Sequence, residues 1–324
     1  MIRFIDRRRA LMVLACAAVA LPATVPAQSD FPNKPIRVIV PFAAGSGADG
    51  ATRVIAEQMQ RTLGQTLVVE NRPGGSGAVA VLAVKQAPAD GYTILVGTNS
   101  PMSVNPIVMK NPGYDSVKDF KPVNGILRSM NVWYVANESP IRSIPDLVAA
   151  AKSKPVSVGS YSAGYHLGIE WVATLGGVKV NYVNYKGQAQ AITDVIGRAL
   201  DVGMGDMSGA LPLIQSGKIR AIGVSGATRH PGLPNVPAIR ETFPEYENYA
   251  WTSFFVRAET PPEAHGKLVA AMQTALRSPE MKRYFEVNGS DPMVDFGPER
   301  MGEHLRQEIA RFRRVADAAG IKAE

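Results

Sequence analysis

The sequence is poor in cysteine: its single cysteine, Cys16, stands near the amino terminus. The rest of the chain therefore offers no disulfide, no cysteine–zinc site and no thiol nucleophile. The four histidines lack metal-binding spacing such as H-E-x-x-H, and the sequence holds no G-x-S-x-G elbow. These absences disfavour a metal site and a hydrolase.

Long apolar runs are also scarce, and a short one near the start has a specific setting. Arg3 and the arginines at 7–9 precede "ALMVLACAAVAL", and small residues follow up to Ala27. This order predicts a secretory signal peptide over residues 1–27, with export to the periplasm by the general or the twin-arginine route. The run is too short for a membrane-spanning helix, which needs about 20 apolar residues. A buried amino-terminal helix is the less favoured alternative.

The charge balance changes once this segment is removed. The formal net charge of +7 falls to +4, because residues 1–27 contain four arginines and one aspartate. No dense basic cluster with interleaved aromatic residues remains, so we expect no nucleic-acid partner. The small positive excess suits an anionic small ligand better than a cationic one.

Several apolar segments do not alternate with polar residues, which is typical of parallel strands buried on both faces. They lie at residues 36–40, 66–70, 92–97, 156–159 and 219–225. Helical patterns between and after them cover residues 51–63, 143–152, 263–277 and 299–318. Strands that alternate with helices predict an α/β fold. A chain of this length favours two lobes with a cleft between them, one from residues 28–123 plus 250–324 and one from residues 124–249.

A glycine motif suggests a ligand. "GSGADG" (45–50) stands between a strand pattern and a helix pattern, and Glu70 closes the next strand, as in a dinucleotide-binding fingerprint. However, "PFAA" separates the strand from the first glycine, and export removes the protein from the cytosolic cofactor pool. An NAD-dependent oxidoreductase is therefore the less favoured interpretation, and we expect no cofactor. The loop still predicts an anion beside backbone N–H groups at a helix start.

Longer stretches resemble a known family over nearly all of the chain beyond the leader. The resemblance to the Bug-type receptors of tripartite tricarboxylate transporters is carried by Trp251 and by five longer motifs: "PFAAGSGADGATRVIAE" (41–57), "VENRPGGSG" (69–77), "DGYTIL" (90–95), "NYKG" (184–187) and "LPNVP" (233–237). The resemblance implies a type II-like periplasmic binding protein fold, each lobe a mixed, mostly parallel sheet flanked by helices. It implies no catalysis. The expected function is to bind a small di- or tricarboxylate, acidic amino acid or aromatic acid and deliver it to the membrane subunits. A carboxylate sensor without transport is the alternative, and we expect a monomer.

The resemblance and the strand ends indicate ligand contacts in the first lobe. Asp49 has two interpretations, a helix cap or a ligand contact, and repulsion of a carboxylate favours the cap. Gly74 lies in "RPGGSG", which is either a second wall of the cleft or a plain turn. The expected contacts are Phe42, Ala44, Gly45, Ser46, Gly47, Gly74, Thr98, Asn99 and Ser100.

The second lobe departs from the family in one loop. "GSYSAGYHL" (159–167) is shorter than usual and carries two tyrosines, which either shrink the pocket or stack on a flatter ligand. Lys186 is a charge partner of the ligand or a strand-end turn, and Asp206 accepts from a ligand or simply ends a strand. The expected contacts here are Ser160, Tyr161, Ser162, Ala163, Gly164, Lys186 and Asp206.

Overall fold

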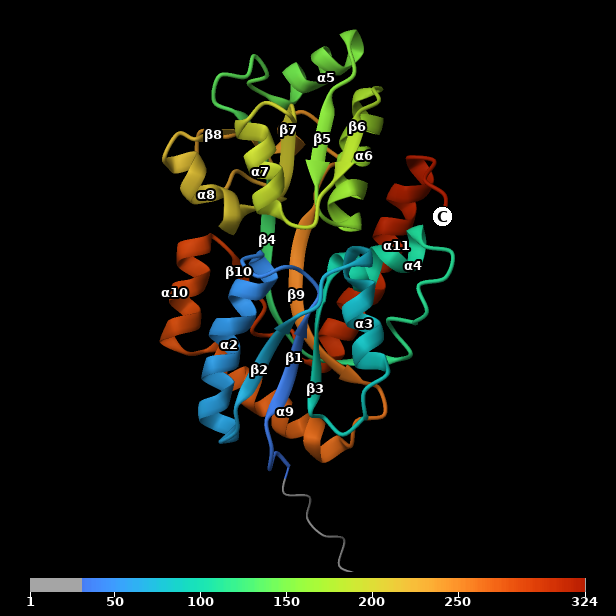
Figure 1. Cartoon of the computed structure of the whole chain (residues 1–324), viewed down its shortest axis with the longest axis vertical. Helices are drawn as coiled ribbons and strands as arrows, with labels where there is room; N and C mark the ends of the chain where they lie inside the picture. Colours follow the sequence, from blue (N-terminus) through green and yellow to red (C-terminus); the bar gives the residue numbers. More distant parts are fainter. Residues whose placement is uncertain (1–30, 324) are drawn as a thin grey trace, which may run out of the picture. The chain divides into compact units, whose positions relative to one another are not determined.

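The computed structural model describes residues 31–323 (Figure 1), and the predicted signal peptide lies outside the described residues. The strands are β1 (Ile36–Val40), β2 (Leu67–Asn71), β3 (Thr93–Thr98), β4 (Phe120–Ala136), β5 (Ser157–Ser160), β6 (Asn181–Asn184), β7 (Val202–Asp206), β8 (Ile219–Val224), β9 (Tyr249–Arg257) and β10 (Asp291–Pro292). The helices are α2 (Gly47–Leu63), α3 (Ala78–Lys85), α4 (Asn105–Val108), α5 (Ile144–Ser153), α6 (Ala163–Gly176), α7 (Gln188–Ile196), α8 (Met207–Gln215), α9 (Pro262–Leu276), α10 (Pro279–Asn288) and α11 (Pro298–Ala318). Short helical turns are η1 (Gly75–Gly77), η2 (Ser100–Val104) and η3 (Ile239–Glu241).

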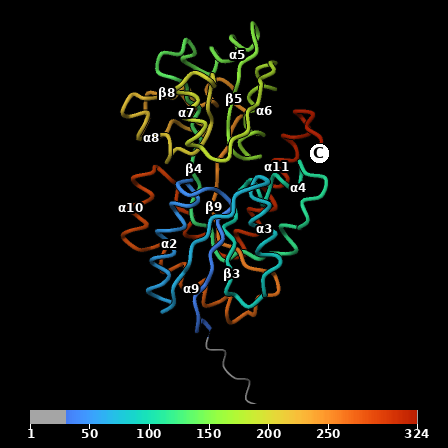
Figure 2. The backbone as a smooth tube through the Cα atoms, in the orientation of Figure 1, coloured from blue at the N-terminus to red at the C-terminus, as the bar shows by residue number. Residues whose placement is uncertain are grey.

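One long strand, β4, links two groups of strands. The order of hydrogen-bonded neighbours is β2-β1-β3-β9-β4-β7-β5-β6, and β10 and β8 also pair with β4. Residues 120–130 of β4 pair with β9, whereas residues 131–136 pair with β7 and β8. We call β1, β2, β3, β9 and β10 the first group and β5 to β8 the second group. The backbone trace shows β4 running from the first group to the second, with β9 beside it (Figure 2).

The sheets are mixed in direction. Parallel pairings join β1 to β2 and β3, and join β5 to β6 and β7. The pairings of β4 and β9 are antiparallel. We expected residues 219–225 to form a parallel strand, which is wrong, because β8 pairs antiparallel with β4. A non-alternating apolar run reports burial on both faces and leaves the strand direction open.

Local sequence signals fix the helix ends. α2 begins at Gly47, four residues before the predicted start, because Ser46 is its N-cap and accepts from the Asp49 backbone N–H. It ends at Gly64, whose φ of 65° suits a left-handed C-cap. Ser143 is the N-cap of α5, and its side chain accepts from the Asp146 backbone N–H. The sequence patterns missed α10, which follows α9 after a break at Ser278 and Pro279.

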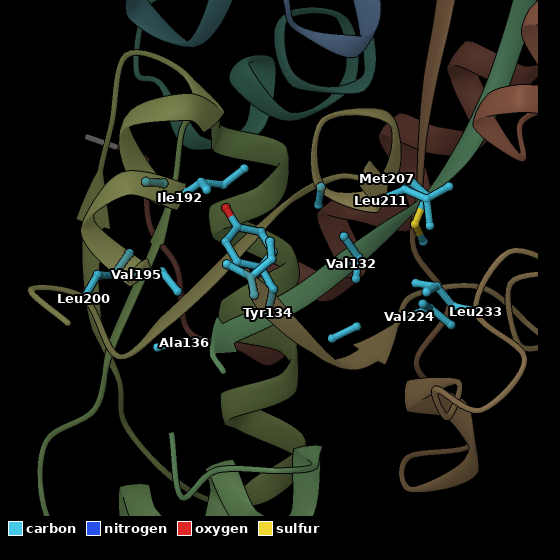
Figure 3. Close-up of a cluster of buried hydrophobic side chains, with 14 of the residues drawn as sticks. Val132, Tyr134, Ala136, Ile192, Val195, Leu200, Met207, Leu211, Val224 and Leu233 are labelled. Atoms are coloured by element: carbon cyan, nitrogen blue, oxygen red, sulfur yellow. The ribbon is translucent and has the colours of Figure 1, made fainter. Parts of the chain in front are cut away.

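Each group of strands packs its own buried cluster. The cluster beside the second group surrounds Tyr134 of β4 with aliphatic side chains from α7, α8 and β8 (Figure 3). The cluster beside the first group joins Leu95, Phe255 and Trp251 to apolar residues of α3 and α11. Among the described residues, no helix has the length and apolar character to cross a membrane.

Close packing between β3 and β9 gives a test of the first cluster. A Cβ at Gly97 would overlap the ring of Phe255, so Gly97→Ala should lower the free energy of unfolding by about 1–3 kcal/mol. Urea unfolding monitored by circular dichroism measures the change. Gly266→Ala in α9 is the matched control, because nothing lies within 4 Å of its new methyl group. The control should be neutral or slightly stabilising; equal losses in both variants would contradict the packing argument.

Candidate functional site

A small cavity lies where the first and second groups of strands meet. Its volume is about 30 Å³, which is room for roughly one water molecule. Predicted contacts that line it are Phe42, Gly47, Thr98, Asn99, Ser100, Tyr161, Ser162 and Asp206. Further lining residues are Ala48, Leu127, Ser129, Tyr165, Ser208, Ala250, Trp251, Thr252, Tyr284 and Ser290. Residues far apart in the sequence thus converge on one site.

The end of β3 supplies the wall on the side of the first group. Thr98 and Asn99 are each 4% exposed, and neither Thr98 Oγ1 nor Asn99 Nδ2 has a hydrogen-bond partner among the described residues. Ser100 Oγ accepts from the backbone N–H of Gly164, at 2.9 Å. A Cβ at Gly164 would lie 2.8 Å from that hydroxyl, so glycine is what permits this close approach.

The glycine loop before α2 forms the next part of the site. Gly45 has a φ of +82° and donates its N–H to Asp49 Oδ2 at 2.9 Å. Although burial opposes it, hydrogen bonds from Arg53, Gly45 and Asn71 lower the pKa of Asp49. The favoured interpretation of Asp49 as the helix cap is wrong, because Ser46 is the cap; the Asp49 carboxylate instead accepts from Arg53 and Asn71.

Gly47 makes the contact across the cavity. Its backbone N–H donates to Asp206 Oδ2 at 3.1 Å, so the start of α2 holds a carboxylate that belongs to the end of β7. A Cβ at Gly47 would lie 3.1 Å from Asp206 Cγ. The predicted anion at this glycine loop is therefore, in this structure, a side chain of the protein itself.

Two tyrosines complete the surroundings of Asp206. The Tyr161 hydroxyl donates to Asp206 Oδ2 and the Tyr165 hydroxyl donates to Oδ1. Burial, followed by the charge of Asp206, raises the pKa of both hydroxyls far above the ordinary value, so both stay protonated. Gln188 fixes the Asp206 backbone by accepting its N–H at 3.0 Å and donating to its carbonyl at 2.9 Å.

Other predicted contacts lie outside this cavity. Gly74 and Lys186 line a neighbouring hollow of about 550 Å³, which shares only Phe42 and Tyr161 with the cavity. Ala44, Gly45, Ser46, Ser160, Ala163 and Gly164 do not line the cavity. Ser46 instead caps α2, and Ser160 Oγ lies 3.1 Å from the Tyr182 hydroxyl. Direct ligand contact by these residues stays a prediction.

Sequence reasoning missed the floor and one edge of the cavity. The floor comes from β4 and β9, through residues such as Ser129 and Thr252, and the edge comes from Tyr284 of α10. Trp251 carried a signal, since it belongs to the family pattern. Ser129 and Thr252 carried none, because only the pairing of their strands brings them to the site.

Glu70 bears on the dinucleotide interpretation of the glycine loop. Its carboxylate accepts from Arg37 Nε at 2.7 Å and from Arg37 Nη2 at 2.9 Å. These hydrogen bonds lower the pKa of Glu70. The acid that would bind a ribose is thus held in a bidentate ion pair at the edge of the β1–β2 pair.

Comparison with known proteins gives a consistent result. Residues 51–321 match the model of the family described as the tripartite tricarboxylate transporter family receptor. A Bordetella bronchiseptica protein of the UPF0065 group is 31% identical over 314 residues, which cover 95% of this chain and 93% of that protein.

Solved structures agree with this match. The periplasmic binding protein BugD has a TM-score of 0.86 and 28% identity, covering 91% of this chain and 100% of that chain. An R. palustris protein with adipate has a TM-score of 0.84 and 32% identity, with the same coverage of 91% and 100%. MatC from Rhodopseudomonas palustris with bound malate has a TM-score of 0.83 and 26% identity, covering 88% and 99%. The predicted fold class and family are confirmed.

The Tyr165–Asp206 hydrogen bond can be tested through stability. Tyr165→Phe removes a buried donor to a charged acceptor, so it should lower the free energy of unfolding by about 1.5–3 kcal/mol. In an Asp206→Ala background the same substitution should cost much less, because the acceptor is gone. Chemical unfolding of the four proteins measures this coupling. An equal cost in both backgrounds would show that the Tyr165 hydroxyl stabilises the fold independently of Asp206.

Proposed function

Because the chain belongs to the tripartite tricarboxylate transporter receptor family, we propose that it binds a small organic carboxylate in this cavity and delivers it to the membrane subunits of such a transporter. Members of the family are periplasmic solute-binding receptors and not enzymes. Export through the amino-terminal segment places the protein on the same side of the membrane as its ligand.

The observation that carries the proposal is the pair of unsatisfied donors at the end of β3. Buried polar atoms in folded proteins almost always have a partner, and those that lack one need an explanation. Thr98 Oγ1 and Asn99 Nδ2 lie side by side in the sequence, are buried, and line the same cavity. A carboxylate has two oxygens that accept such bonds, so one bound group would satisfy both donors.

Relatives support a carboxylate ligand. The R. palustris protein with adipate and MatC with malate share this fold at 32% and 26% identity. Both ligands are small organic acids with a carboxylate at each end. We assign a ligand of the same chemical class to this chain.

The size of the cavity bears on how a ligand enters. A volume of about 30 Å³ is too small for any organic acid, so the walls must separate for binding. Tyr161 and Phe42 meet edge to face, with ring centroids 5.5 Å apart, between the cavity and the neighbouring hollow. Hinge closure over a ligand is a common motion of binding proteins with this fold. Entry past this aromatic pair, followed by closure, is the sequence of events we propose.

Thr98→Val tests the proposed carboxylate contact. It removes a hydroxyl that has no partner, so the melting temperature without ligand should stay the same or rise. Carboxylate affinity should fall by roughly tenfold, which corresponds to one lost hydrogen bond to a charged group. Thermal shift with a panel of di- and tricarboxylates identifies the ligand, and calorimetry then measures its affinity.

Ser103→Ala is the matched control, because it also removes a buried hydroxyl without a partner but does not line the cavity. Its affinity for the same carboxylate should equal that of the wild type. The proposal fails if no carboxylate in the panel raises the melting temperature, or if the two variants weaken binding equally.

A further inference from the structure

Asp206 stands out because it is the one charged residue among the described residues that line the cavity. It is 7% exposed, and the three groups that donate hydrogen bonds to its carboxylate are all neutral. They are the backbone N–H of Gly47 and the hydroxyls of Tyr161 and Tyr165. A buried carboxylate of this kind, left bare, would attract the ammonium group of an amino acid.

The two tyrosines weaken the attraction of Asp206 for an ammonium group, because they donate hydrogen bonds to its carboxylate. An ionised carboxylate has about four lone-pair positions. Oδ2 already accepts from Gly47 and Tyr161, and Oδ1 accepts from Tyr165. We propose that Tyr161 and Tyr165 are specificity-determining residues, which occupy Asp206 and make the site select carboxylates without an ammonium group over the matching amino acids.

The physical reason lies in the cost of desolvating an ammonium group. That cost is offset only when the group makes direct, charge-assisted hydrogen bonds. Three of the four positions are filled, so an ammonium that made more than one hydrogen bond to Asp206 would displace Tyr161 or Tyr165, each of which is at most 6% exposed. The displaced hydroxyl would then be buried without a partner, which is unfavourable by itself. The tyrosines therefore act as built-in donors that take the place of a ligand donor.

The rest of the cavity is consistent with this selection. The polar side chains at the end of β3 are uncharged. Two of their atoms, Thr98 Oγ1 and Asn99 Nδ2, are donors without partners among the described residues. Donors there favour the ligand carboxylate, whereas Asp206, the one anion among the described residues that line the cavity, already accepts three hydrogen bonds. The aromatic ring of Tyr161 also packs against that of Tyr165, with centroids 5.1 Å apart.

The test compares pairs of acids that differ only by an α-ammonium: succinate with aspartate, glutarate with glutamate, and adipate with α-aminoadipate. Isothermal titration calorimetry measures the affinity of the wild-type protein for both acids of each pair. In the best-binding pair, the acid without the ammonium group, here called the plain acid, should bind more tightly by about tenfold or more. Tyr161→Phe and Tyr165→Phe, made separately, should each shift this ratio toward the amino acid by roughly tenfold. On an Asp206→Asn background the same substitutions should not shift the ratio, because the negative charge is absent.

Tyr114→Phe is the control for a general loss of stability. Its hydroxyl donates to the Pro101 carbonyl at 2.5 Å and is buried, but it does not line the cavity. This variant should leave the ratio unchanged. A wild-type protein that binds the amino acid as tightly as the plain acid, or tyrosine variants with an unchanged ratio, would overturn the inference. The inference rests on the proposed function. If the proposed function is wrong, none of these acids will bind the wild-type protein, which differs from either of the results that overturn the inference alone.

Discussion

The antiparallel pairing of β4 with β9 is the constraint on which the site depends. β4 leaves the first group at about residue 130 and continues directly into the second group, so one strand belongs to both. The pairing sets Leu127 opposite Thr252 and Ser129 opposite Ala250, and all four line the cavity. Since every second residue of a strand points to the same face, a shift of one residue would turn these side chains away. The floor of the site is therefore fixed by backbone hydrogen bonds rather than by its own side chains.

The walls of the site are joined by contacts between small backbone groups and polar side chains. Gly47 approaches Asp206, and Gly164 approaches Ser100, each through its backbone N–H; an added Cβ would lie 3.1 Å from Asp206 Cγ and 2.8 Å from Ser100 Oγ. Neither contact is an ion pair, although the one to the Asp206 carboxylate is charge-assisted and therefore the stronger of the two. If a ligand enters as proposed, both contacts break and then re-form.

Much of the fold could be predicted from the sequence, because its short buried strands are apolar and its helices carry ordinary caps. β1 and α11 begin and end within a residue of their predicted bounds. β4 was missed because Pro122, Asn124 and Gly125 interrupt its apolar pattern, and the structure places register shifts there. α10 was missed because it is short and largely polar on the surface, and its position depends on packing against α2. The division into lobes at residues 123 and 249 stays a prediction, although the two groups of strands meet within β4.

The residues that line the cavity at a strand end could be predicted from the sequence. Those that reach the cavity only through contacts between distant segments could not. Thr98, Asn99 and Ser100 directly follow or close β3, so their place at a strand end, together with the family resemblance, indicated them. The glycine loop was expected to bind a ligand anion, which stays a prediction, and no sequence pattern shows that Gly47 of this loop donates to the carboxylate of Asp206, 159 residues away. That partner explains why the loop at 159–167 contains tyrosines. A carboxylate brought against backbone N–H groups in a buried site needs further donors, and the hydroxyls of Tyr161 and Tyr165 provide them.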